Sequence, residues 1–331
     1  MKNKTALITG ITGQDGAYLA SFLIKKGYKV IGTSRKLNES NLLRLEYLGC
    51  RQKITLLDVD LTDKKVVYKL INECKPNEIY NLAAQSSVGL SFKIPIETFQ
   101  YNTLSVINLL DSIKEIDKKI KFYQASSSEM FGNVSSDKLP IRETQHFNPV
   151  SPYGTSKASS HFLAINYREA FGLYTSCGIL FNHESSLRGD NFVVKKIINT
   201  ALKIKQGKED TLTLGNLTVS RDWGYAPKYV EAMWKMLQMA EPDDYVICSG
   251  NNETLQNLVV KIFDKLDLDL NKHLRLNQDF MRSSDLSMMY GDNTKAREKL
   301  DWNYDLTTND LIDHLIKDEY DYIAWLEKMY Q

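Results

Sequence analysis

The chain has 331 residues, with 42 lysines and arginines against 41 aspartates and glutamates, so its formal net charge is +1. This balance argues against a protein that binds nucleic acid through a basic surface. No apolar run reaches the length of a membrane span and no signal peptide fits the first residues, so we expect no membrane contact. The length is sufficient for two domains.

The cysteines and histidines show no spacing typical of a disulfide framework or a metal site. The scattered positions of Cys50, Cys74, Cys177 and Cys248 predict buried, reduced thiols, as in a cytoplasmic protein. The five histidines lack metal-ligand spacing, so we predict no metal. His183, in "NHES", is more typical of a structural histidine than of a catalytic one.

The first half of the chain alternates apolar strands with helical patterns. The spacing predicts strands over 5–10, 28–34, 53–59, 78–83 and 121–127, and helices over 16–27, 62–74 and 151–172. Strands that alternate with helices of this length predict βαβ units and a parallel sheet. Their continuous apolar character indicates burial on both faces. We therefore expect an α/β fold with a doubly wound (Rossmann) sheet, and Thr62 as an N-cap of its helix.

Three glycines follow the first strand in "LITGITGQDGAYLA", namely Gly10, Gly13 and Gly16. A glycine turn between a first strand and its helix is where doubly wound sheets bind a pyrophosphate, because backbone N–H groups and the helix dipole face the anion there. The alternative is a tight turn without a ligand. Asp15 is electrostatically unfavourable beside a phosphate, so we expect it to cap the helix start or to point away.

The end of the second predicted strand reads "GTSRK", with Arg35 and Lys36 where an acid would bind the 2′-hydroxyl of NAD. Two cations suit a 2′-phosphate, which favours NADP over NAD. The alternative is that both cations belong to a solvated turn. Asp60, which follows the third strand, is expected at the adenine edge.

Two short motifs predict the chemistry. "SPYGTSK" places Tyr153 and Lys157 four residues apart on a helix, so both side chains share one face. A lysine ammonium there is expected to lower the pKa of the tyrosine, which is ordinarily ~10, toward a working range. In "ASSSEMFG", Ser127 and Glu129 share one side if the strand continues. Ser127 then relays a hydrogen bond and Glu129 removes a proton from carbon, although Glu129 could also be a solvated acid.

Several stretches together resemble one family. "GITGQDG", "LAAQSSVGLSF", "SSSEMFG", "SPYGTSK", "LFNHES", "RGDNFVVKKI" and "LGNLTVSRDWGYA" are similar to the extended short-chain dehydrogenase/reductases, and more narrowly to the GDP-mannose 4,6-dehydratases. The resemblance runs from about residue 4 to 302. It implies a hydro-lyase that oxidises C4 of a GDP-sugar, eliminates water across C5 and C6, and returns the hydride to C6.

The resemblance also implies three sets of site residues. The catalytic set is Ser127, Glu129, Tyr153 and Lys157. The cofactor set adds Gly10, Gly13, Gly16, Arg35, Asp60, Leu61, Leu82, Ala83 and Ala84. The substrate set is Ser87, Asn182, Lys196, Gly215, Arg221, Arg282 and Asp285.

The sugar and the reaction class stay open at this point. Ser87 stands where the family has a histidine, Leu187 where it has an arginine, and Asp285 where it has a glutamate. These differences concern the sugar and the nucleotide, so the substrate is GDP-mannose or a related GDP-sugar such as a GDP-heptose. A sugar-nucleotide 4-dehydrogenase, 4-epimerase or 4-reductase without elimination is the alternative within the fold. A catalytically inactive nucleotide-binding protein is the alternative of another class.

The domain organisation follows from the order of these motifs. Residues 1–181 are expected to form the NADP-binding domain, rejoined by about 221–245, and residues 182–331 mainly a smaller, discontinuous α/β substrate domain. The apolar spacing near the end of the chain predicts a packed terminal helix. Helices near 95–116 and 151–172 resemble the pair that forms a dimer interface in this superfamily, which implies a homodimer or homotetramer.

Overall fold

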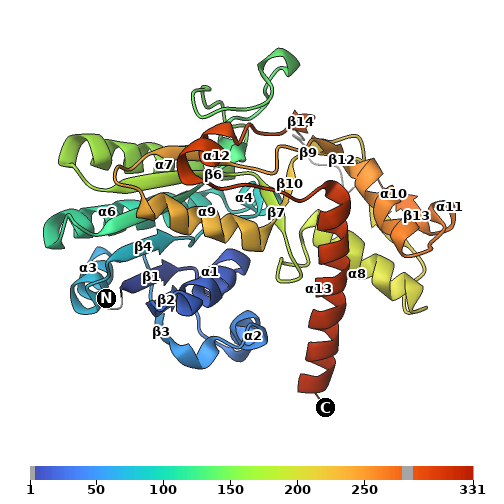
Figure 1. The fold of residues 1–331 in the computed structure, drawn as a ribbon, viewed down its shortest axis with the longest axis horizontal. Coiled ribbons are helices and arrows are strands. Elements are labelled where there is room, and N and C mark those ends of the chain that lie inside the picture. The colour runs from blue at the N-terminus through green and yellow to red at the C-terminus, as the bar shows by residue number, and fades with distance from the viewer. Residues whose placement is uncertain (1–3, 278–285, 331) are drawn as a thin grey trace.

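A parallel seven-stranded sheet forms the centre of the computed structural model, which describes residues 4–277 and 286–330 (Figure 1). The sheet confirms the predicted doubly wound α/β fold. Across the sheet the strands are β11 (Asp244–Ile247), β6 (Thr175–Leu180), β5 (Lys121–Ser127), β4 (Glu78–Asn81), β1 (Thr5–Thr9), β2 (Lys29–Ser34) and β3 (Ile54–Asp58). The strand order reverses between β1 and β4, and in open α/β sheets ligands bind at such a switch point.

Helices cover both faces of the sheet. One face carries α1 (Gln14–Lys25), α2 (Glu39–Tyr47), α9 (Ala226–Gln238) and α12 (Thr294–Leu300). The other carries α3 (Lys64–Cys74), α6 (Ser105–Ile116) and α7 (Pro152–Phe171). Each face has its own apolar cluster, because strands buried on both sides need cover on both.

The N-cap of α3 lies one residue later than predicted. This N-cap is Asp63, whose side chain accepts hydrogen bonds from the backbone N–H groups of Lys65 and Val66. The predicted N-cap Thr62 instead donates its hydroxyl to Asp60 at 2.7 Å. The prediction of Thr62 as the cap is therefore wrong, because the neighbouring carboxylate reaches the free N–H groups.

The helical stretch before β5 is interrupted by a wider turn. After α4 (Val88–Ser91), the helices α5 (Pro95–Phe99) and α6 are joined by a π-helical turn, η2 (Gln100–Leu104). Short 3₁₀ turns occur at η1 (Arg51–Lys53), η3 (Ser128–Met130) and η4 (Ser136–Lys138). π turns are frequent at functional sites because they rotate side chains out of the regular helical positions.

A smaller region packs beside the carboxyl ends of the strands. Its helices are α8 (Val193–Lys205), α10 (Leu255–Lys265), α11 (Leu270–His273) and α13 (Thr308–Met329). Its short strands are β7 (Asn182–Glu184), β8 (Leu212–Leu214), β9 (Ser220–Arg221), β10 (Trp223–Tyr225), β12 (Glu253–Thr254), β13 (Leu274–Leu276) and β14 (Met288–Met289). A separate apolar cluster holds α8, α10 and α13 together, and Figure 1 shows them on the side opposite α3 and α6.

The terminal helix α13 starts at a capping box. The Thr307 hydroxyl accepts a hydrogen bond from Asp310 N, and the Asp310 side chain accepts one from Thr307 N. Leu311, Ile312 and Leu315 are buried on one face, as the apolar spacing predicts. Farther along, the Tyr322 ring lies 4.9 Å from Tyr47 of α2, so α13 contacts both parts of the molecule.

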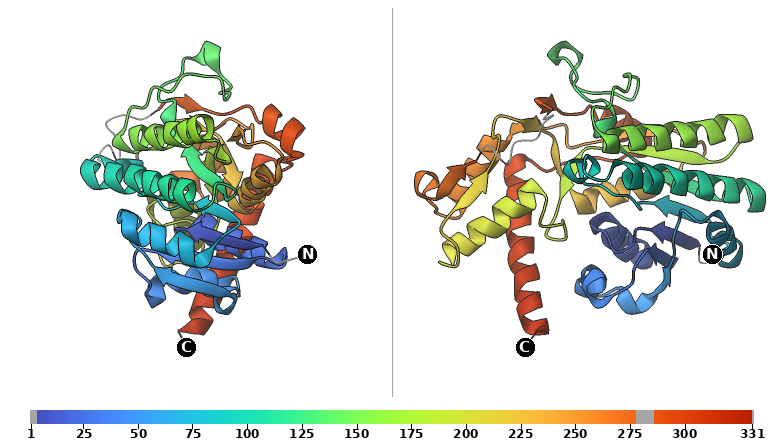
Figure 2. Two further views of the ribbon diagram at one scale, coloured as in Figure 1. Left: turned by 90° about the vertical axis from the view of Figure 1, so that its left-hand side faces the viewer. Right: turned by 180° about the vertical axis from the view of Figure 1, so that it is seen from behind.

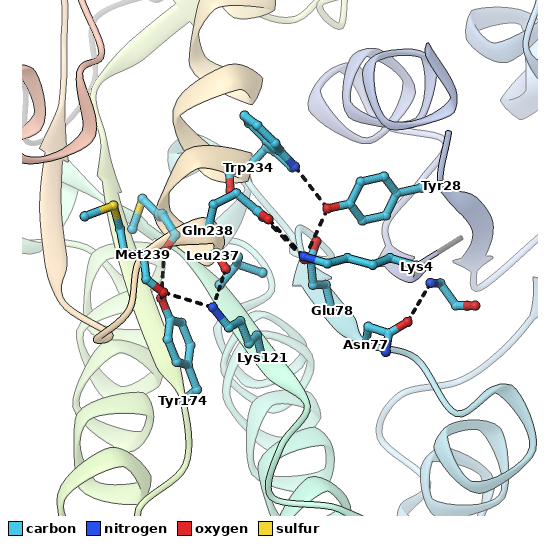
Figure 3. A network of polar contacts seen from close by, with 12 residues as sticks. Lys4, Tyr28, Asn77, Glu78, Lys121, Tyr174, Trp234, Leu237, Gln238 and Met239 are labelled. Atoms are coloured by element: carbon cyan, nitrogen blue, oxygen red, sulfur yellow. Dashed lines mark hydrogen bonds and ion pairs between the residues drawn. The ribbon is translucent and has the colours of Figure 1, made fainter. Parts of the chain in front are cut away.

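Polar contacts attach α9 to the amino end of the sheet (Figure 3). Glu78 of β4 is 1% exposed and binds Lys4 at 2.8 Å and Gln238 of α9 at 3.3 Å. Lys121 donates to the carbonyl groups of Leu237 and Met239 at 2.7 and 2.9 Å, which satisfies the free carbonyl end of α9. These contacts and the position of β11 in the sheet support our proposal that the segment from about 221 to 245 belongs to the nucleotide-binding domain.

None of the helices in residues 4–277 and 286–330 is long and apolar enough to cross a membrane.

Candidate active site

A cavity of about 1060 Å³ lies between the carboxyl ends of the sheet and the smaller region. Its size is typical of a site for a large ligand. The predicted site residues in its wall are Gly10, Gly13, Gly16, Arg35, Leu82, Ala83, Ala84, Ser87, Ser127, Glu129, Tyr153, Lys157, Asn182, Lys196, Gly215 and Arg221. Residues predicted from both halves of the chain therefore share one cavity.

The glycine turn forms a close backbone cradle. Gly10 has a φ of +67°, and a Cβ there would lie 2.9 Å from the backbone of Ala83. A Cβ on Gly16 would lie 2.4 Å from the carbonyl oxygen of Gly10. The first turn of α1 has no side-chain cap, so its N–H groups face the cavity without a competing side chain. Such a cradle fits the pyrophosphate of a dinucleotide.

At the end of β2, Arg35 and Lys36 are exposed and both line the cavity. The Arg35 guanidinium lies 3.8 Å above the ring of Tyr101, which also lines the cavity. Stacking on an aromatic ring restrains the guanidinium in the orientation that presents its N–H groups. Sequence reasoning missed Tyr101 because the π turn that carries it leaves no clear pattern in the sequence.

Tyr153 and Lys157 lie in the first turns of α7, as predicted. Pro152 occupies the first helical turn, and the Ser151 hydroxyl accepts a hydrogen bond from Gly154 N at 3.0 Å. Tyr153 is 8% exposed and Lys157 is 6% exposed. The cap thus fixes the start of the helix that holds both groups in the cavity wall.

The electrostatics of this pair differ from the expectation. Burial raises the pKa of Tyr153 to about 12, although a hydrogen bond from Ser127 acts to lower it. Burial lowers the pKa of Lys157 to about 8, and its ammonium donates to the carbonyl of Ala125 at 2.9 Å. The pKa of Tyr153 is therefore not brought toward the working range expected from Lys157, because desolvation dominates both groups.

Ser127 and Glu129 both reach the cavity, but not on a continuing strand. β5 ends at Ser127, and Glu129 lies in the 3₁₀ turn η3. The Ser127 hydroxyl accepts a hydrogen bond from Glu129 N at 3.2 Å, which starts this turn. The condition that the strand continues is therefore not met, and the turn brings the half-buried Glu129 to the cavity instead.

Two predicted cofactor residues lie outside the cavity wall, and two predicted substrate residues lie outside the described part of the chain. Asp60 is exposed and accepts hydrogen bonds from Thr62, which lower its pKa, whereas Leu61 is buried. Neither Asp60 nor Leu61 is among the residues that line the cavity. Arg282 and Asp285 fall outside the described residues.

The substrate side of the cavity carries two cations and an amide. Lys196 of α8 donates to the carbonyl of Thr213 at 2.7 Å, and Arg221 of β9 is 8% exposed. Asn182 begins β7 beside them in the cavity wall. Ser87 lines the cavity too, but its hydroxyl is engaged as the N-cap of α4, where it accepts from Leu90 N. This combination is suited to an anionic, hydroxyl-rich ligand.

Arg188 is the arginine kept in "NHESSLRG", next to Leu187, whereas the partner of Asp15 was missed by sequence reasoning. The Arg188 guanidinium lies in the cavity wall, 3.8 Å above the Phe192 ring. Asp15 does not cap α1, whose N-cap is Gly13; its carboxylate instead meets the ring of His183 at 2.8 Å. The Asp15–His183 contact joins residues far apart in the chain and has no local signature.

Comparison with known proteins identifies the family. The model of the family described as GDP-mannose 4,6 dehydratase matches residues 7–315. GDP-mannose 4,6 dehydratase 1 of Arabidopsis thaliana is 43% identical over 309 residues, covering 90% of this chain and 85% of that protein. The Homo sapiens GDP-mannose 4,6 dehydratase is 40% identical over 336 residues, covering 94% of this chain and 90% of that protein.

Solved structures show the same fold at lower identity. The UDP-N-acetylglucosamine 4-epimerase of Methanobrevibacter ruminantium M1 superposes with a TM-score of 0.84 at 23% identity, covering 98% of this chain and all of that one. At this sequence identity, the structural similarity supports only the assignment of the fold. The family match over most of the length, together with relatives at about 40% identity, decides the family. The chain belongs to the GDP-mannose 4,6-dehydratase family.

Proposed function

We propose that this chain catalyses the 4,6-dehydration of GDP-mannose, or of a closely related GDP-sugar such as a GDP-heptose, with a nicotinamide cofactor. The observation that carries the proposal is the meeting of Ser127, Glu129, Tyr153 and Lys157 in one cavity that also contains the glycine cradle. Tyr153 and Lys157 without a further acid or base would suit a dehydrogenase. A carboxylate beside them supplies the base that an elimination requires.

The cofactor is proposed to be NADP, with NAD as the alternative. Gly10, Gly13 and Gly16 would hold the pyrophosphate, and Arg35, restrained by Tyr101, would meet the 2′-phosphate. The segment Leu82–Ala84 would lie along the nicotinamide half, since it follows β4 at the switch point of the sheet. A bound nicotinamide would supply the hydride acceptor for the oxidation at C4 and the hydride donor for the reduction at C6.

The chain's own groups move the protons. Tyr153 would take the proton of the C4 hydroxyl, with Ser127 hydrogen-bonded to it and Lys157 next to it on the same helix face. The C4 carbonyl then acidifies the C5 proton, which Glu129 would remove while the C6 hydroxyl leaves as water. A proton returned to C5 completes the 4-keto-6-deoxy product. Glu129 is half-buried at the cavity wall, as a base for carbon requires.

The GDP-sugar is proposed to lie across the smaller region. Lys196 and Arg221 would face the diphosphate, and Asn182 and Gly215 would contact the sugar and nucleotide. Ser87 would border the sugar, where its short side chain leaves room for a larger substituent. Arg282 and Asp285 remain predicted nucleotide contacts. The geometry does not favour an epimerase or an inactive binding protein, because neither would use Glu129 as a base for the C5 proton.

The assembly is proposed to be a homodimer or homotetramer. Large apolar side chains are exposed along α4, α5, η2 and α7, among them Leu90, Phe92, Ile96, Phe99, Leu104 and Phe162. Figure 2 shows α6 and α7 running side by side on this surface. A row of this kind is typical of a protein interface, and a second copy can present the same row. The cysteines of the described chain are free thiols, which suits the proposed cytoplasmic location.

The test separates the two chemical stages. Glu129→Gln keeps the size of the side chain but removes the base, so it should still reduce bound cofactor while losing water elimination by about 10²–10⁴-fold. Tyr153→Phe should abolish both stages, because no C4 ketone forms. Absorbance of reduced nicotinamide reports the first stage, and the mass of the nucleotide sugar reports the second. Elimination at the wild-type rate in Glu129→Gln would exclude Glu129 as the base.

A further inference from the structure

Arg44 of α2 joins two stretches of chain that are far apart in the sequence and both contribute to the cavity wall. Its Nε donates to the carbonyl oxygen of Leu187 at 2.7 Å, and its Nη1 donates to the carbonyl oxygen of Thr12 at 3.1 Å. Thr12 lies in the glycine turn before α1, and Leu187 lies between β7 and α8. One guanidinium therefore bridges the proposed cofactor turn and the segment that leads into α8.

Arg44 lies next to the cavity wall but is not part of it. Thr12 and Arg188 line the cavity, whereas Arg44 is not among the lining residues. Burial lowers the pKa of Arg44, but the ordinary pKa of a guanidinium is so high that the group stays charged. The N–H groups of a guanidinium form a rigid, planar fork, so Arg44 can hold two carbonyl oxygens at one fixed spacing. Both hydrogen bonds are charge-assisted.

The segment that Arg44 holds carries groups of the proposed ligand sites. Arg188 follows Leu187 directly and lines the cavity, and the segment continues into α8, where Lys196 lines it too. The Leu187 side chain is 1% exposed and packs in the apolar cluster on one face of the sheet. A shift of the Leu187 carbonyl would therefore move the start of the stretch that faces the ligands.

Other contacts at this junction hold the residues that precede Leu187. Gln14 accepts a hydrogen bond from the Ser185 hydroxyl at 2.7 Å and donates to the carbonyl of His183 at 3.2 Å. The Ser185 hydroxyl also accepts from Leu187 N at 3.1 Å. Gln14 lines the cavity, so its substitution would disturb ligand contacts as well. A substitution of Arg44 tests the junction without removing a group from the cavity wall.

We propose that Arg44 is a positioning residue that holds the stretch after Leu187 against the glycine turn, so that the cavity is arranged for cofactor and GDP-sugar before either binds. This inference rests on the proposed cofactor and substrate sites. If the two stretches were held less firmly, only a fraction of the molecules would be competent to bind, and each ligand alone would bind more weakly by that fraction. The first ligand to bind would then arrange the cavity for the second.

The test measures the binding of GDP, which fits the proposed nucleotide site but carries no sugar to react. The full chain is freed of copurified nucleotide and titrated by calorimetry, first without cofactor and then with the tighter-binding of NADP⁺ and NAD⁺ at saturation. Arg44→Met removes both donors, so GDP alone should bind roughly 10-fold more weakly than to the wild type. At saturating cofactor, the affinity of the variant should equal that of the wild type under the same condition.

Arg51→Met is the matched control, because it removes a guanidinium of the neighbouring turn η1 that lies 4.0 Å from Glu46, outside the cavity wall. Its GDP affinities should equal those of the wild type. Arg44→Lys keeps the charge but lacks the fixed fork, so it should show the pattern of Arg44→Met with a smaller loss. Unweakened GDP binding to cofactor-free Arg44→Met would overturn the proposal. A loss that persists at saturating cofactor would also overturn it, because the cavity would then be permanently altered.

A second measurement needs no ligand and separates this proposal from the proposed function. The backbone N–H groups of Leu187 and Arg188 both donate to Ser185, inside the stretch that Arg44 holds. Hydrogen exchange followed by mass spectrometry should therefore be faster at these two residues in ligand-free Arg44→Met. Peptides from α10, which packs in the apolar cluster of the smaller region, should exchange as in the wild type.

The exchange experiment has clear contrary outcomes. Unchanged exchange at Leu187 and Arg188 would overturn the proposal, and so would faster exchange that extends to α10, since it would show general unfolding instead of local release. Local release in a chain that performs no dehydration would reject the proposed function and keep the role of Arg44.

Discussion

At the residue scale, we propose that single side chains at the end of β2 select which nicotinamide cofactor the chain binds. Arg35 is exposed, lines the cavity and is restrained on the ring of Tyr101. A charge-assisted hydrogen bond to a phosphate contributes about 1.5–3 kcal/mol, which corresponds to roughly 10- to 100-fold in affinity. Arg35→Ala should therefore weaken NADP by about that factor and leave NAD nearly unchanged, as measured by titration calorimetry.

The control for this prediction is another arginine that does not line the cavity. Arg51→Ala removes a partly buried guanidinium next to Glu46, outside the cavity wall. It should bind both cofactors as the wild type does. Equal losses of NADP and NAD in Arg35→Ala would mean that Arg35 does not meet the 2′-phosphate.

At the residue scale, the roles of the glycines and the shared helix face of Tyr153 and Lys157 could be predicted, because both depend only on neighbouring residues in the sequence. A tight turn needs glycine, and two residues four apart share a helix face whatever surrounds them. The charge states could not be predicted in the same way. The pKa of Tyr153 depends on burial by both halves of the chain, and burial reverses the shift expected from Lys157.

Among the secondary-structure elements, α7 is linked to the edge strand β11 by a partly buried ion pair. Arg168 of α7 donates two hydrogen bonds to Asp244, at 3.0 and 2.8 Å, and both side chains are less than one-fifth exposed. Burial acts to raise the pKa of Asp244, but the hydrogen bond and charge of Arg168, together with His161 and a hydrogen bond from Cys177, hold the pKa below its usual value. This contact keeps the helix of Tyr153 and Lys157 against the sheet.

Asp244→Asn should lower the free energy of unfolding by about 1.5–3 kcal/mol at neutral pH, because it weakens two hydrogen bonds to a charged group. A carboxyl whose pKa is lowered in the fold stabilises above its unfolded pKa, here 3.8, and loses this effect as the pH falls. The difference between variant and wild type should therefore shrink below about pH 4.

The measurement is urea unfolding followed by circular dichroism over a range of pH. Glu73→Gln is the control, since its i,i+4 contact with Lys69 is exposed and is worth at most about 0.5 kcal/mol. A stability difference for Asp244→Asn that stays constant down to acid pH would contradict the assigned role of the ion pair.

At the element scale, most strands could be predicted, but the turns that aim the site residues could not. The continuous apolar runs mark the buried strands from their own composition. The π turn that presents Tyr101 and the 3₁₀ turn that presents Glu129 depend on packing against α7 and the sheet. Tertiary contacts select such turns. The local sequence pattern alone therefore does not predict where these two side chains point.

For the whole molecule, the exposed apolar row on α5 and α7 predicts self-association. Ile96 of α5 is 68% exposed and Phe162 of α7 is 51% exposed. Size-exclusion chromatography with light scattering should give two or four times the chain mass. The double variant Ile96→Asp with Phe162→Asp should shift it toward the monomer, because charges in an apolar interface are desolvated without partners.

Leu276 offers a control on another surface. It is 66% exposed on β13, in the smaller region. Leu276→Asp should leave the oligomer unchanged. A wild-type chain that is monomeric and active would contradict the proposed interface.

At this scale, the likeness of several motifs to one family predicted the reaction class, and the family match confirms that assignment. What remains to be measured is the reaction of this chain itself. The most direct measurement is incubation with GDP-mannose in D₂O, followed by mass spectrometry and NMR of the nucleotide sugar. The account predicts loss of one water, one deuterium at C5 and none at C6, because Glu129 exchanges its proton with solvent whereas the hydride moves from C4 to C6. A product that keeps the C6 hydroxyl, as a C4 ketone or a C4 epimer, would contradict it.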